Sequence, residues 1–241
     1  MSPIRSNLEL AINMIDTVVH IIAVLGGTGK EGKGLAYRWA KSGYTVLIGS
    51  RTFEKAEATA AEINGILTGT AFVEGVNNLE AARRADIVVL TVPYSAHRET
   101  LESVRSALHG KILVDVTVPL VPPKVTKVQM PAAGSAAQEA HTILGDGIEV
   151  TSAFHNISYE HLLTDKPVEC DVLVAGTSRE ARLQTLRLVS AAGFTGWDAG
   201  PIENSVVLEG LTSVLIGINK LHGSRSAGIR ITGVQATDQD P

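Results

Sequence analysis

The chain has 241 residues, a formal net charge of −4 at pH 7 and 44% hydrophobic residues. A chain of this kind can bury the core of one α/β domain with a small addition. The charge excludes a basic nucleic-acid surface. No apolar run reaches the roughly 20 residues needed to cross a bilayer, and the start of the sequence lacks a secretory-signal pattern. We therefore expect a cytoplasmic protein with no membrane or nucleic-acid partner.

Strand-like and helix-like runs alternate along the chain. We expect strands at residues 20–25, 45–48, 70–73, 87–92, 111–116, 149–154, 171–174 and 196–199. We expect helices at residues 32–42, 54–63, 79–84, 95–108, 135–144, 179–192 and 202–222. This order predicts an α/β fold with a doubly wound parallel sheet, extended by the later strands. Residues 1–19 precede the first strand and are interpreted as an N-terminal extension.

The first strand leads into the pattern G-x-G-x-x-G, formed by Gly27, Gly29 and Gly32. In a dinucleotide-binding Rossmann domain, the first glycine allows the tight turn and the second lets the backbone approach the pyrophosphate. The third permits close packing of helix and strand. Glycine loops also occur as plain turns, but here a strand precedes the pattern, a helix follows it and a second strand comes next. The segment therefore predicts a dinucleotide site.

The end of the second strand indicates which dinucleotide is bound. An NAD site normally has Asp or Glu there, to accept hydrogen bonds from the ribose 2′-OH. This chain has Ser50, Arg51 and Thr52, followed by Lys55. Arg51 can bind a 2′-phosphate with two hydrogen bonds, and Lys55 adds a second positive charge. The alternative is an ordinary solvated helix start, but the residue types favour NADP.

Three further features bear on the chemistry. Val92 and Pro93 close the fourth predicted strand, so with Tyr94 they should form a wall beside the nicotinamide ribose. The long helix at residues 202–222 has no lysine before Lys220 that could act as a general acid–base group. The rest of the sequence shows no acid–base pair for an alcohol substrate and no cluster with metal-ligand spacing. Either the substrate needs no acid–base group, as in hydride exchange between two redox cofactors, or the chain is not a catalyst.

Residues 21–231 resemble the F420-dependent NADP oxidoreductases. The resemblance rests on several segments, at residues 23–29, 48–51, 90–93, 152–155, 198–201 and 208–212. It implies hydride transfer between NADP(H) and the deazaflavin coenzyme F420. It also implies an NADP-binding Rossmann domain at residues 20–200 and a small helical C-terminal domain at 201–241 that completes the deazaflavin cleft.

Site residues follow from the same resemblance. The pyrophosphate would lie against Thr28, Gly29, Lys30 and Glu31, and the 2′-phosphate against Ser50, Arg51 and Lys55. His155 would position or polarise a ring in the cleft, Ile157 would line it, and Leu211 would face the deazaflavin from the last helix. The best-known members have a proline where this chain has Ser158 and a tryptophan where it has Tyr94.

Other residues receive structural interpretations. Cys170 opens the apolar run at 170–174, which favours a buried structural role over a catalytic thiol. Four other histidines, at positions 97, 109, 141 and 161, are expected at the surface or at helix ends. Lys220, Arg225 and Arg230 are either helix-end cations or a patch that attracts the anionic tail of F420.

Two other functions stay open from the sequence. One is an NADP-dependent imine reductase resembling the pyrroline-5-carboxylate reductases, which also lack a strong acid–base signature. The other is a non-catalytic NADP sensor. In each case the apolar helix at residues 202–222 needs a covering surface, so we expect a homodimer.

Overall fold

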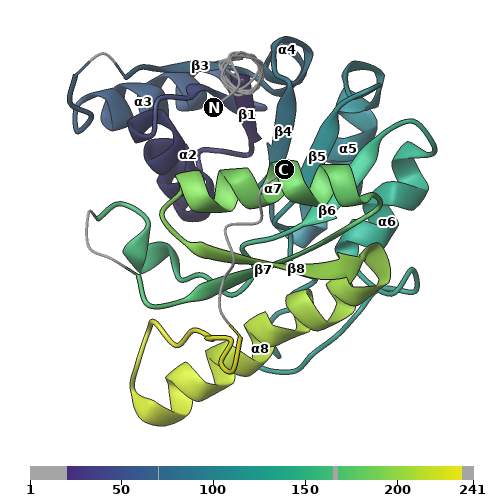
Figure 1. Ribbon diagram of the computed structural model, residues 1–241. Coiled ribbons are helices and arrows are strands. Elements are labelled where there is room, and N and C mark those ends of the chain that lie inside the picture. The colour runs from purple at the N-terminus through teal and green to yellow at the C-terminus, as the bar shows by residue number, and fades with distance from the viewer. Residues whose placement is uncertain (1–20, 70, 165–167, 235–241) are drawn as a thin grey trace, which may run out of the picture.

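The computed structural model describes residues 21–69, 71–164 and 168–234, so the predicted extension at residues 1–19 lies outside the described part (Figure 1). The strands are β1 (Ile21–Leu25), β2 (Thr45–Ser50), β3 (Val73–Asn77), β4 (Ile87–Leu90), β5 (Ile112–Asp115), β6 (Glu149–Ser152), β7 (Asp171–Gly176) and β8 (Thr195–Pro201). The α-helices are α2 (Lys30–Lys41), α3 (Phe53–Asn64), α4 (Asn78–Arg84), α5 (His97–Val104), α6 (Ala136–Leu144), α7 (Arg179–Ala191) and α8 (Ser205–His222).

The strands form a single mixed sheet in the order β3-β2-β1-β4-β5-β6-β7-β8. The first six in this order are parallel, and β7 and β8 are parallel to each other. The predicted parallel sheet, extended by the later strands, is thus confirmed, but the pair β6–β7 is antiparallel, which the prediction did not include. In the described part of the segment joining the two strands, residues 153–164 and 168–170, the one helical element is the short 3₁₀ turn Tyr159–His161. A parallel pair would need a crossover back to the opposite edge, which this segment does not make.

Both faces of the sheet are covered, which confirms the predicted doubly wound arrangement. Alternate residues of β1 point to opposite faces: Ile22 and Val24 belong to one apolar cluster, and Ala23 and Leu25 to the other. The first cluster includes buried residues of α2, α3 and α7, and the second includes those of α4, α5 and α6. The strands that build the cofactor edge are therefore fixed from both sides.

Several predicted elements have different bounds in the structure. β3 runs over Val73–Asn77 rather than residues 70–73, and at its first residue the Asn64 side chain donates to the Val73 carbonyl and accepts from its N–H, both at 2.8 Å. The strand then runs through Gly75, where a Cβ atom would lie 2.4 Å from backbone atoms of α3. The predicted helix at 95–108 is divided, with α5 flanked by the 3₁₀ turns Tyr94–Ala96 and Arg105–Ala107.

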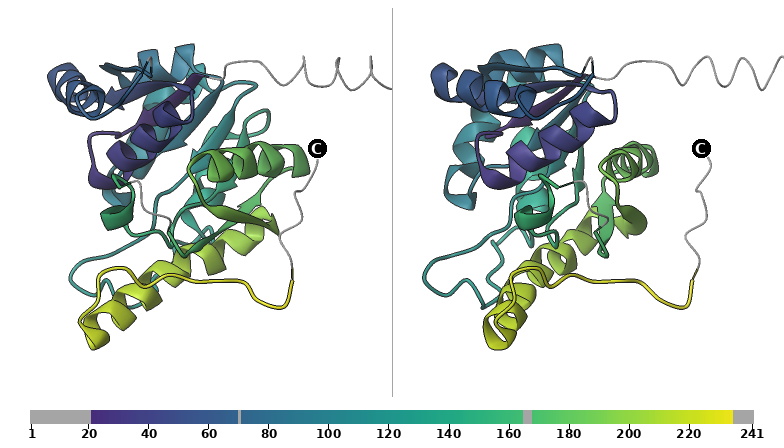
Figure 2. Two further views of the ribbon diagram at one scale, coloured as in Figure 1. Left: turned by 60° about the vertical axis from the view of Figure 1, so that its left-hand side comes forward. Right: turned by 90° about the vertical axis from the view of Figure 1, so that its left-hand side faces the viewer.

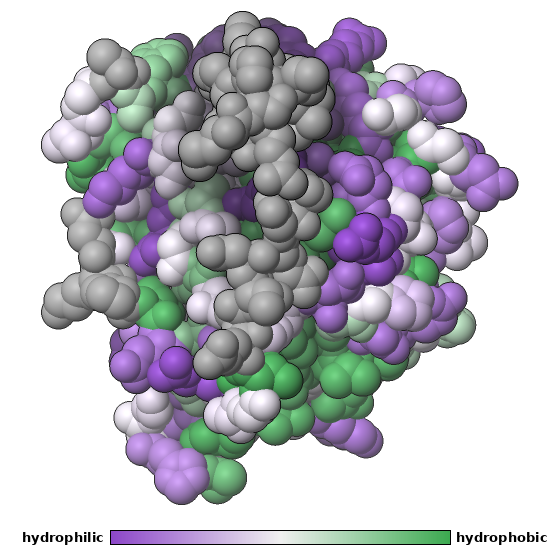
Figure 3. Space-filling view, viewed as in Figure 1, coloured by the Kyte–Doolittle hydropathy of each residue, from purple (hydrophilic) through white to green (hydrophobic). Residues whose placement is uncertain are grey.

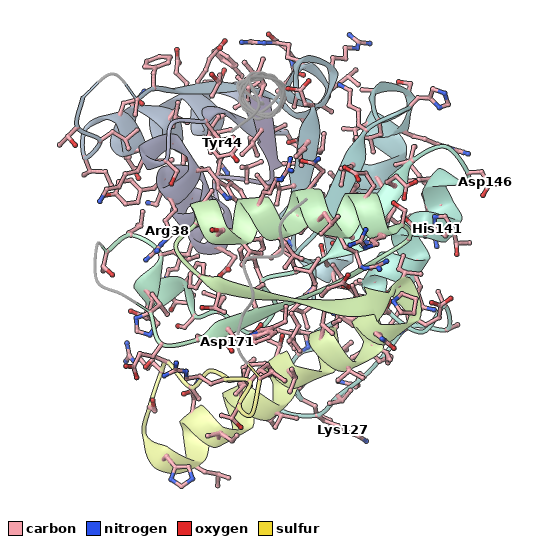
Figure 4. All side chains as sticks on the ribbon, in the orientation of Figure 1. Arg38, Tyr44, Lys127, His141, Asp146 and Asp171 are labelled. Carbon is pink, nitrogen blue, oxygen red and sulfur yellow. The ribbon has the colours of Figure 1, made fainter. Side chains whose placement is uncertain are left out.

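The C-terminal part crosses the edge of the sheet where the parallel strands end. After the 3₁₀ turn Ile202–Asn204, α8 packs against β7 and α6, and it ends at Gly223, whose backbone is left-handed. The chain then returns to β7, where Asp171 accepts hydrogen bonds from the Trp197 ring and from the Ile231 N–H, both at 2.8 Å. Figures 2 and 4 show α8 along the lower edge of the molecule, and Figure 4 shows Asp171 above it.

Candidate functional site

A cleft of about 760 Å³ runs along the carboxyl ends of the parallel strands. Its walls come from the glycine loop, the ends of β2, β4 and β5, the loop after β6, and one face of α8. The neighbours β1 and β4 lie where the strand order reverses, which is the position at which doubly wound sheets bind dinucleotides. The predicted site residues therefore come together from segments that are far apart in the sequence.

The glycine loop has the geometry that a pyrophosphate cradle requires. Gly27 could not carry a side chain, since a Cβ atom would lie 2.7 Å from the Val24 carbonyl oxygen, and at Gly32 it would lie 2.5 Å from Thr91 Oγ1. The residue with a left-handed backbone is Gly26, which precedes the predicted motif. α2 begins directly after Gly29 and has no side-chain cap. Its first N–H groups therefore face the cleft and suit an anion.

The predicted 2′-phosphate residues lie at one end of the cleft. Ser50, Arg51 and Lys55 all line it. Ser50 is buried and accepts a hydrogen bond from the Thr52 N–H at 3.2 Å, which fixes the turn between β2 and α3. Arg51 is exposed, and its guanidinium lies 3.9 Å from the Glu99 carboxylate. A loose surface pair of this kind contributes little energy, so Arg51 can turn toward a phosphate at low cost.

Val92 and Pro93 line the cleft beside the glycine loop. Their position is fixed by Thr91, whose N–H and hydroxyl both donate to the Leu25 carbonyl at the end of β1, at 2.9 and 3.0 Å. A Cβ atom at Gly26 would lie 2.5 Å from the Val92 side chain. Close contact between the two strand ends therefore sets the width of this part of the cleft.

The loop after β6 brings His155 and Ile157 into the cleft. β6 stops earlier than predicted because Phe154 has a left-handed backbone, with φ of 69°. This conformation costs about 1 kcal/mol or more in a non-glycine residue. The Phe154 ring is buried between Trp39 and Phe194, with edge-to-face contacts at centroid distances of 5.8 and 6.4 Å. This packing holds the strained residue and aims its neighbour into the cleft.

His155 is buried, and neither of its ring nitrogens has a hydrogen-bond partner among the described residues. Burial lowers the pKa of its ring to about 4, although Asp115 acts in the opposite direction. The ring is therefore neutral at pH 7, with one nitrogen able to donate and the other able to accept. Its backbone carbonyl accepts a 2.6 Å hydrogen bond from Thr212 on α8, which ties this loop to the last helix.

α8 supplies a different set of residues from the predicted one. Leu211 does not line the cleft, whereas Thr212, Leu215, Ile216 and Asn219 do. The helix presents to the cleft the face that begins at Thr212, since Thr212, Ile216 and Asn219 follow one another at helical spacing. Of the predicted cationic patch, only Arg225 reaches the cleft wall.

Comparison with known proteins assigns the family. The family model for coenzyme F420-dependent NADP oxidoreductases matches residues 21–119. The F420-dependent NADP reductase of Methanothermobacter thermautotrophicus is 41% identical, over 92% of this chain and 98% of its own length. That of Methanocaldococcus jannaschii is 38% identical, over 89% of this chain and 99% of its own. The chain belongs to the F420-dependent NADP reductase family. This confirms the predicted family, its activity, and NADP(H) and coenzyme F420 as the cofactors.

Solved structures confirm the fold. A crystal structure from Arthrobacter sp. FB24 assigned to the F420-dependent NADP reductases has a TM-score of 0.74 at 24% identity, covering 88% of this chain and 99% of that one. An imine reductase from Myxococcus stipitatus has a TM-score of 0.60 at 20% identity, covering 85% and 62%. The alternative function predicted from the sequence thus belongs to a protein with the same fold, but the sequence relatives place this chain with the F420-dependent reductases.

Sequence reasoning missed a buried histidine–carboxylate pair behind the cleft of this family member. His97, expected at the surface or at a helix end, is the first residue of α5 but is fully buried, and its Nε2 lies 2.7 Å from Asp115 at the end of β5. Burial opposes the charge on His97, but the charge and hydrogen bond of Asp115 outweigh it and raise the pKa. Tyr94 stacks on the His97 ring and donates to Glu139 at 2.6 Å. In the sequence, His97 is followed at helical spacing by Thr100, Leu101 and Val104, which places the four side chains on one face of a helix. This pattern was the signal that His97 is buried together with that face.

A second missed residue is Glu209, which is buried between α8 and the start of α6. Its carboxyl oxygens accept hydrogen bonds from the Ala136 and Ala137 N–H groups at 2.7 and 3.1 Å. Burial raises the pKa of this carboxyl group to about 8, although the two hydrogen bonds act against that rise. The contact joins the last helix to the first turn of α6. A single carboxylate within an otherwise apolar helix was the available signal.

Other predictions concern residues outside the site chemistry. Cys170 is buried, and its sulfur accepts a hydrogen bond from the Asn156 side chain. Burial raises the pKa of its thiol, in line with a structural role. The described ranges contain no group of three or more His, Cys, Asp or Glu side chains placed to hold a metal ion. Over the same ranges, none of the helices combines the length and the apolar character required to cross a membrane.

Proposed function

We propose that NADP(H) lies along the cleft from Arg51 to His155, and that the deazaflavin ring of F420 stacks on the nicotinamide between His155, Ile157 and α8. This proposal is supported by one continuous cleft that includes both the glycine loop and the wall made by the loop after β6 and α8. The two coenzymes supply the chemistry, a hydride passing between the nicotinamide and C5 of the deazaflavin. The residues of this chain align the two rings and exclude water.

The assay that tests this function follows bleaching of oxidised F420 absorption on mixing with NADPH and the protein. We expect bleaching, and restoration when reduced F420 is mixed with NADP⁺. A chain that binds NADP⁺ but bleaches no F420 would contradict the proposal. Reduction of a cyclic imine in place of F420 would indicate the imine reductase function, and binding with neither activity would indicate a sensor.

His155 is proposed as the polar group that positions a ring at the reacting end of the cleft. The support is its buried, unpartnered ring, which can donate one hydrogen bond and accept another at neutral pH. In His155→Ala we expect the turnover number to fall about tenfold, the loss associated with one hydrogen bond. Its thermal midpoint should stay within a few degrees of the parent. The control is His109→Ala, at an exposed histidine outside the cleft, for which turnover should not change.

We also propose a homodimer that forms through α8. Val207, Val214, Ile218 and Leu221 are exposed at 59%, 48%, 41% and 83%, and their spacing places them on one stripe of the helix. Figure 3 shows apolar side chains gathered over the lower edge of the molecule, where α8 lies. We expect sedimentation to give twice the chain mass, and Val214→Glu to give the monomer. Glu99→Lys, at an exposed site on α5, is the matched control and should stay dimeric.

The proposal also covers the division of the chain into domains and its location in the cell. The boundary between a Rossmann domain at residues 20–200 and a helical domain at 201–241 falls at the end of β8. We propose that this second part serves to close the deazaflavin side of the cleft. We propose the cytoplasm as the location, because both coenzymes of the reaction are carried by intracellular pools.

A further inference from the structure

Glu31 occupies an unusual place at the start of α2. It is the second residue of that helix and lines the cleft next to the glycine loop. The residue keeps some exposed surface, but its carboxyl oxygen Oε1 is fully enclosed and has no hydrogen-bond partner among the described residues. Gly34 lies one helical turn further on, where a Cβ atom would meet the Leu162 side chain at 2.3 Å. Glu31 therefore faces the segment after β6, on the reacting side of the cleft.

The cations around Glu31 are engaged elsewhere. Lys30 lies over the Tyr159 ring, with Nζ 4.5 Å from the ring centroid and 3.3 Å from the hydroxyl. Lys33 pairs with Glu62 of α3 at 2.8 Å. The buried His155 ring in the loop after β6 has a pKa of about 4 and is neutral.

The remaining charged groups lie further away along the packed elements. At the end of β2, Arg51 is next to Glu99, and Lys55 of α3 lines the far end of the same cleft. His161 lies on the 3₁₀ turn, but outside the cleft wall. α7 packs on α2 near Trp39, about 12 Å along the helix from Glu31. Among the residues that the structure describes, no cation therefore offsets the burial of Glu31, which raises the pKa of its carboxyl group to about 8.

A negative carboxylate cannot share this place with a pyrophosphate at low cost. The N–H groups at the start of α2 attract phosphate oxygens to within a few ångströms of Glu31. Two anions at that distance in an enclosed site repel each other, whereas a neutral carboxyl group has an O–H that can donate to one of them. Binding of the anion should therefore favour the protonated acid even more strongly than the empty cleft does.

Building on the proposed NADP position, we propose that Glu31 is a neutral carboxylic acid in the loaded protein and donates a hydrogen bond to a pyrophosphate oxygen. When Glu31 is ionised in the free protein, NADP⁺ binding takes up one proton from the solvent. When Glu31 is already protonated, binding takes up none. Glu31 thereby acts as a binding residue whose protonation is coupled to cofactor affinity.

The test measures the dissociation constant for NADP⁺ by titration calorimetry between pH 7 and 9.5, a range above the titration of the 2′-phosphate. For the parent chain we expect affinity about eightfold weaker at pH 9 than at pH 7.5, as follows from a pKa of about 8. Calorimetry in two buffers of different ionisation heat should show uptake approaching one proton at pH 9. Glu31→Gln keeps a donor of the same shape without titrating, so its affinity should match the parent at pH 7 and vary less with pH.

The outcomes separate this proposal from the proposed function. Equal pH dependence in the parent and in Glu31→Gln, or no proton uptake at pH 9, would overturn the role of Glu31 even if F420 is reduced. The predicted dependence without F420 reduction would support Glu31 and contradict only the function. A parent chain that binds no NADP⁺ would overturn both. Thermal melting of Glu31→Gln checks folding, and Glu31→Ala, which should bind more weakly but without the pH dependence, provides the second variant.

Discussion

In the double variant Ser50→Asp/Arg51→Ala, the dissociation constant for NADP⁺ is expected to rise by about 100-fold, while that for NAD⁺ stays the same or falls. Arg51 can hold the 2′-phosphate with two charge-assisted hydrogen bonds, and losing them costs about 2–3 kcal/mol. The new carboxylate at position 50 would repel a phosphate and accept hydrogen bonds from a ribose 2′-OH. Binding titrations with the two dinucleotides measure the change directly.

Because Ser50 is buried, its substitution could disturb folding, and single variants at Arg51 separate that effect from a loss of phosphate binding. Arg51→Ala alone should account for most of the loss in NADP⁺ affinity. Arg51→Lys should lose about tenfold, because it keeps the charge but not the paired hydrogen bonds. The matched control is Arg83→Ala, which removes an exposed arginine of α4 that lies outside the cleft wall. An unchanged preference for NADP⁺ in Arg51→Ala would show that the 2′-phosphate lies elsewhere.

The largest effect on stability is expected at Arg38, which connects α2 to two other segments. Its guanidinium donates to the carbonyl groups of His161, Leu162, Thr164 and Ala192, at 2.7 to 3.0 Å, and stacks over the Phe194 ring. Figure 4 shows the side chain pointing from α2 toward the segment after β6. Arg38→Met should lower the free energy of unfolding by about 3 kcal/mol, because four carbonyl groups, three of them in partly buried hydrogen bonds, lose a charged donor. The thermal midpoint should fall by roughly 6–12 °C.

Arg105→Met is the matched control for this prediction. Arg105 donates through Nε to a single carbonyl, that of Leu144, at 3.2 Å. Its loss should therefore cost about 1 kcal/mol or less. Equal changes in thermal midpoint for the two variants would contradict the prediction. They would mean that the four hydrogen bonds of Arg38 together stabilise the fold no more than the single hydrogen bond of Arg105. NADP⁺ affinity of Arg38→Met should also fall, since the segment that carries Tyr159 loses its anchor.

The dinucleotide half of the site was predictable because its determinants are local in the sequence. A glycine loop between strand and helix, and Ser50 with Arg51 at the end of the next strand, fix geometry within about 25 residues. Hydrophobic alternation likewise predicted the strands and most helices. The strand direction at β6–β7 could not be read in this way. The apolar pattern of a buried strand is the same in either direction, and only the missing crossover helix indicated the antiparallel pair.

The rest of the site depends on pairs that are distant in sequence. His97 and Asp115 meet only because α5 packs beneath the end of β5, and Glu209 meets α6 across more than 70 residues. The role of α8 was predicted one residue out of phase, at Leu211 rather than Thr212, because the helix is apolar on several faces. The resemblance placed Glu31 at the pyrophosphate, but the glycine motif leaves the residue type at its position unspecified, so nothing in the sequence indicated a buried carboxyl group there. Its enclosure appears only once the segment after β6 is folded over it.

The antiparallel junction has a consequence for how this fold can diversify. The segment between β6 and β7 leaves and re-enters the sheet at the same edge. Its length and sequence can therefore change without any change in strand order. The segment also contacts α2 through Lys30 and Arg38, so a change in it is expected to alter NADP affinity as well as the wall against which we propose that F420 binds. A chimaera that exchanges residues 157–164 for the corresponding loop of another protein with this sheet should keep its dinucleotide preference while taking a different hydride acceptor.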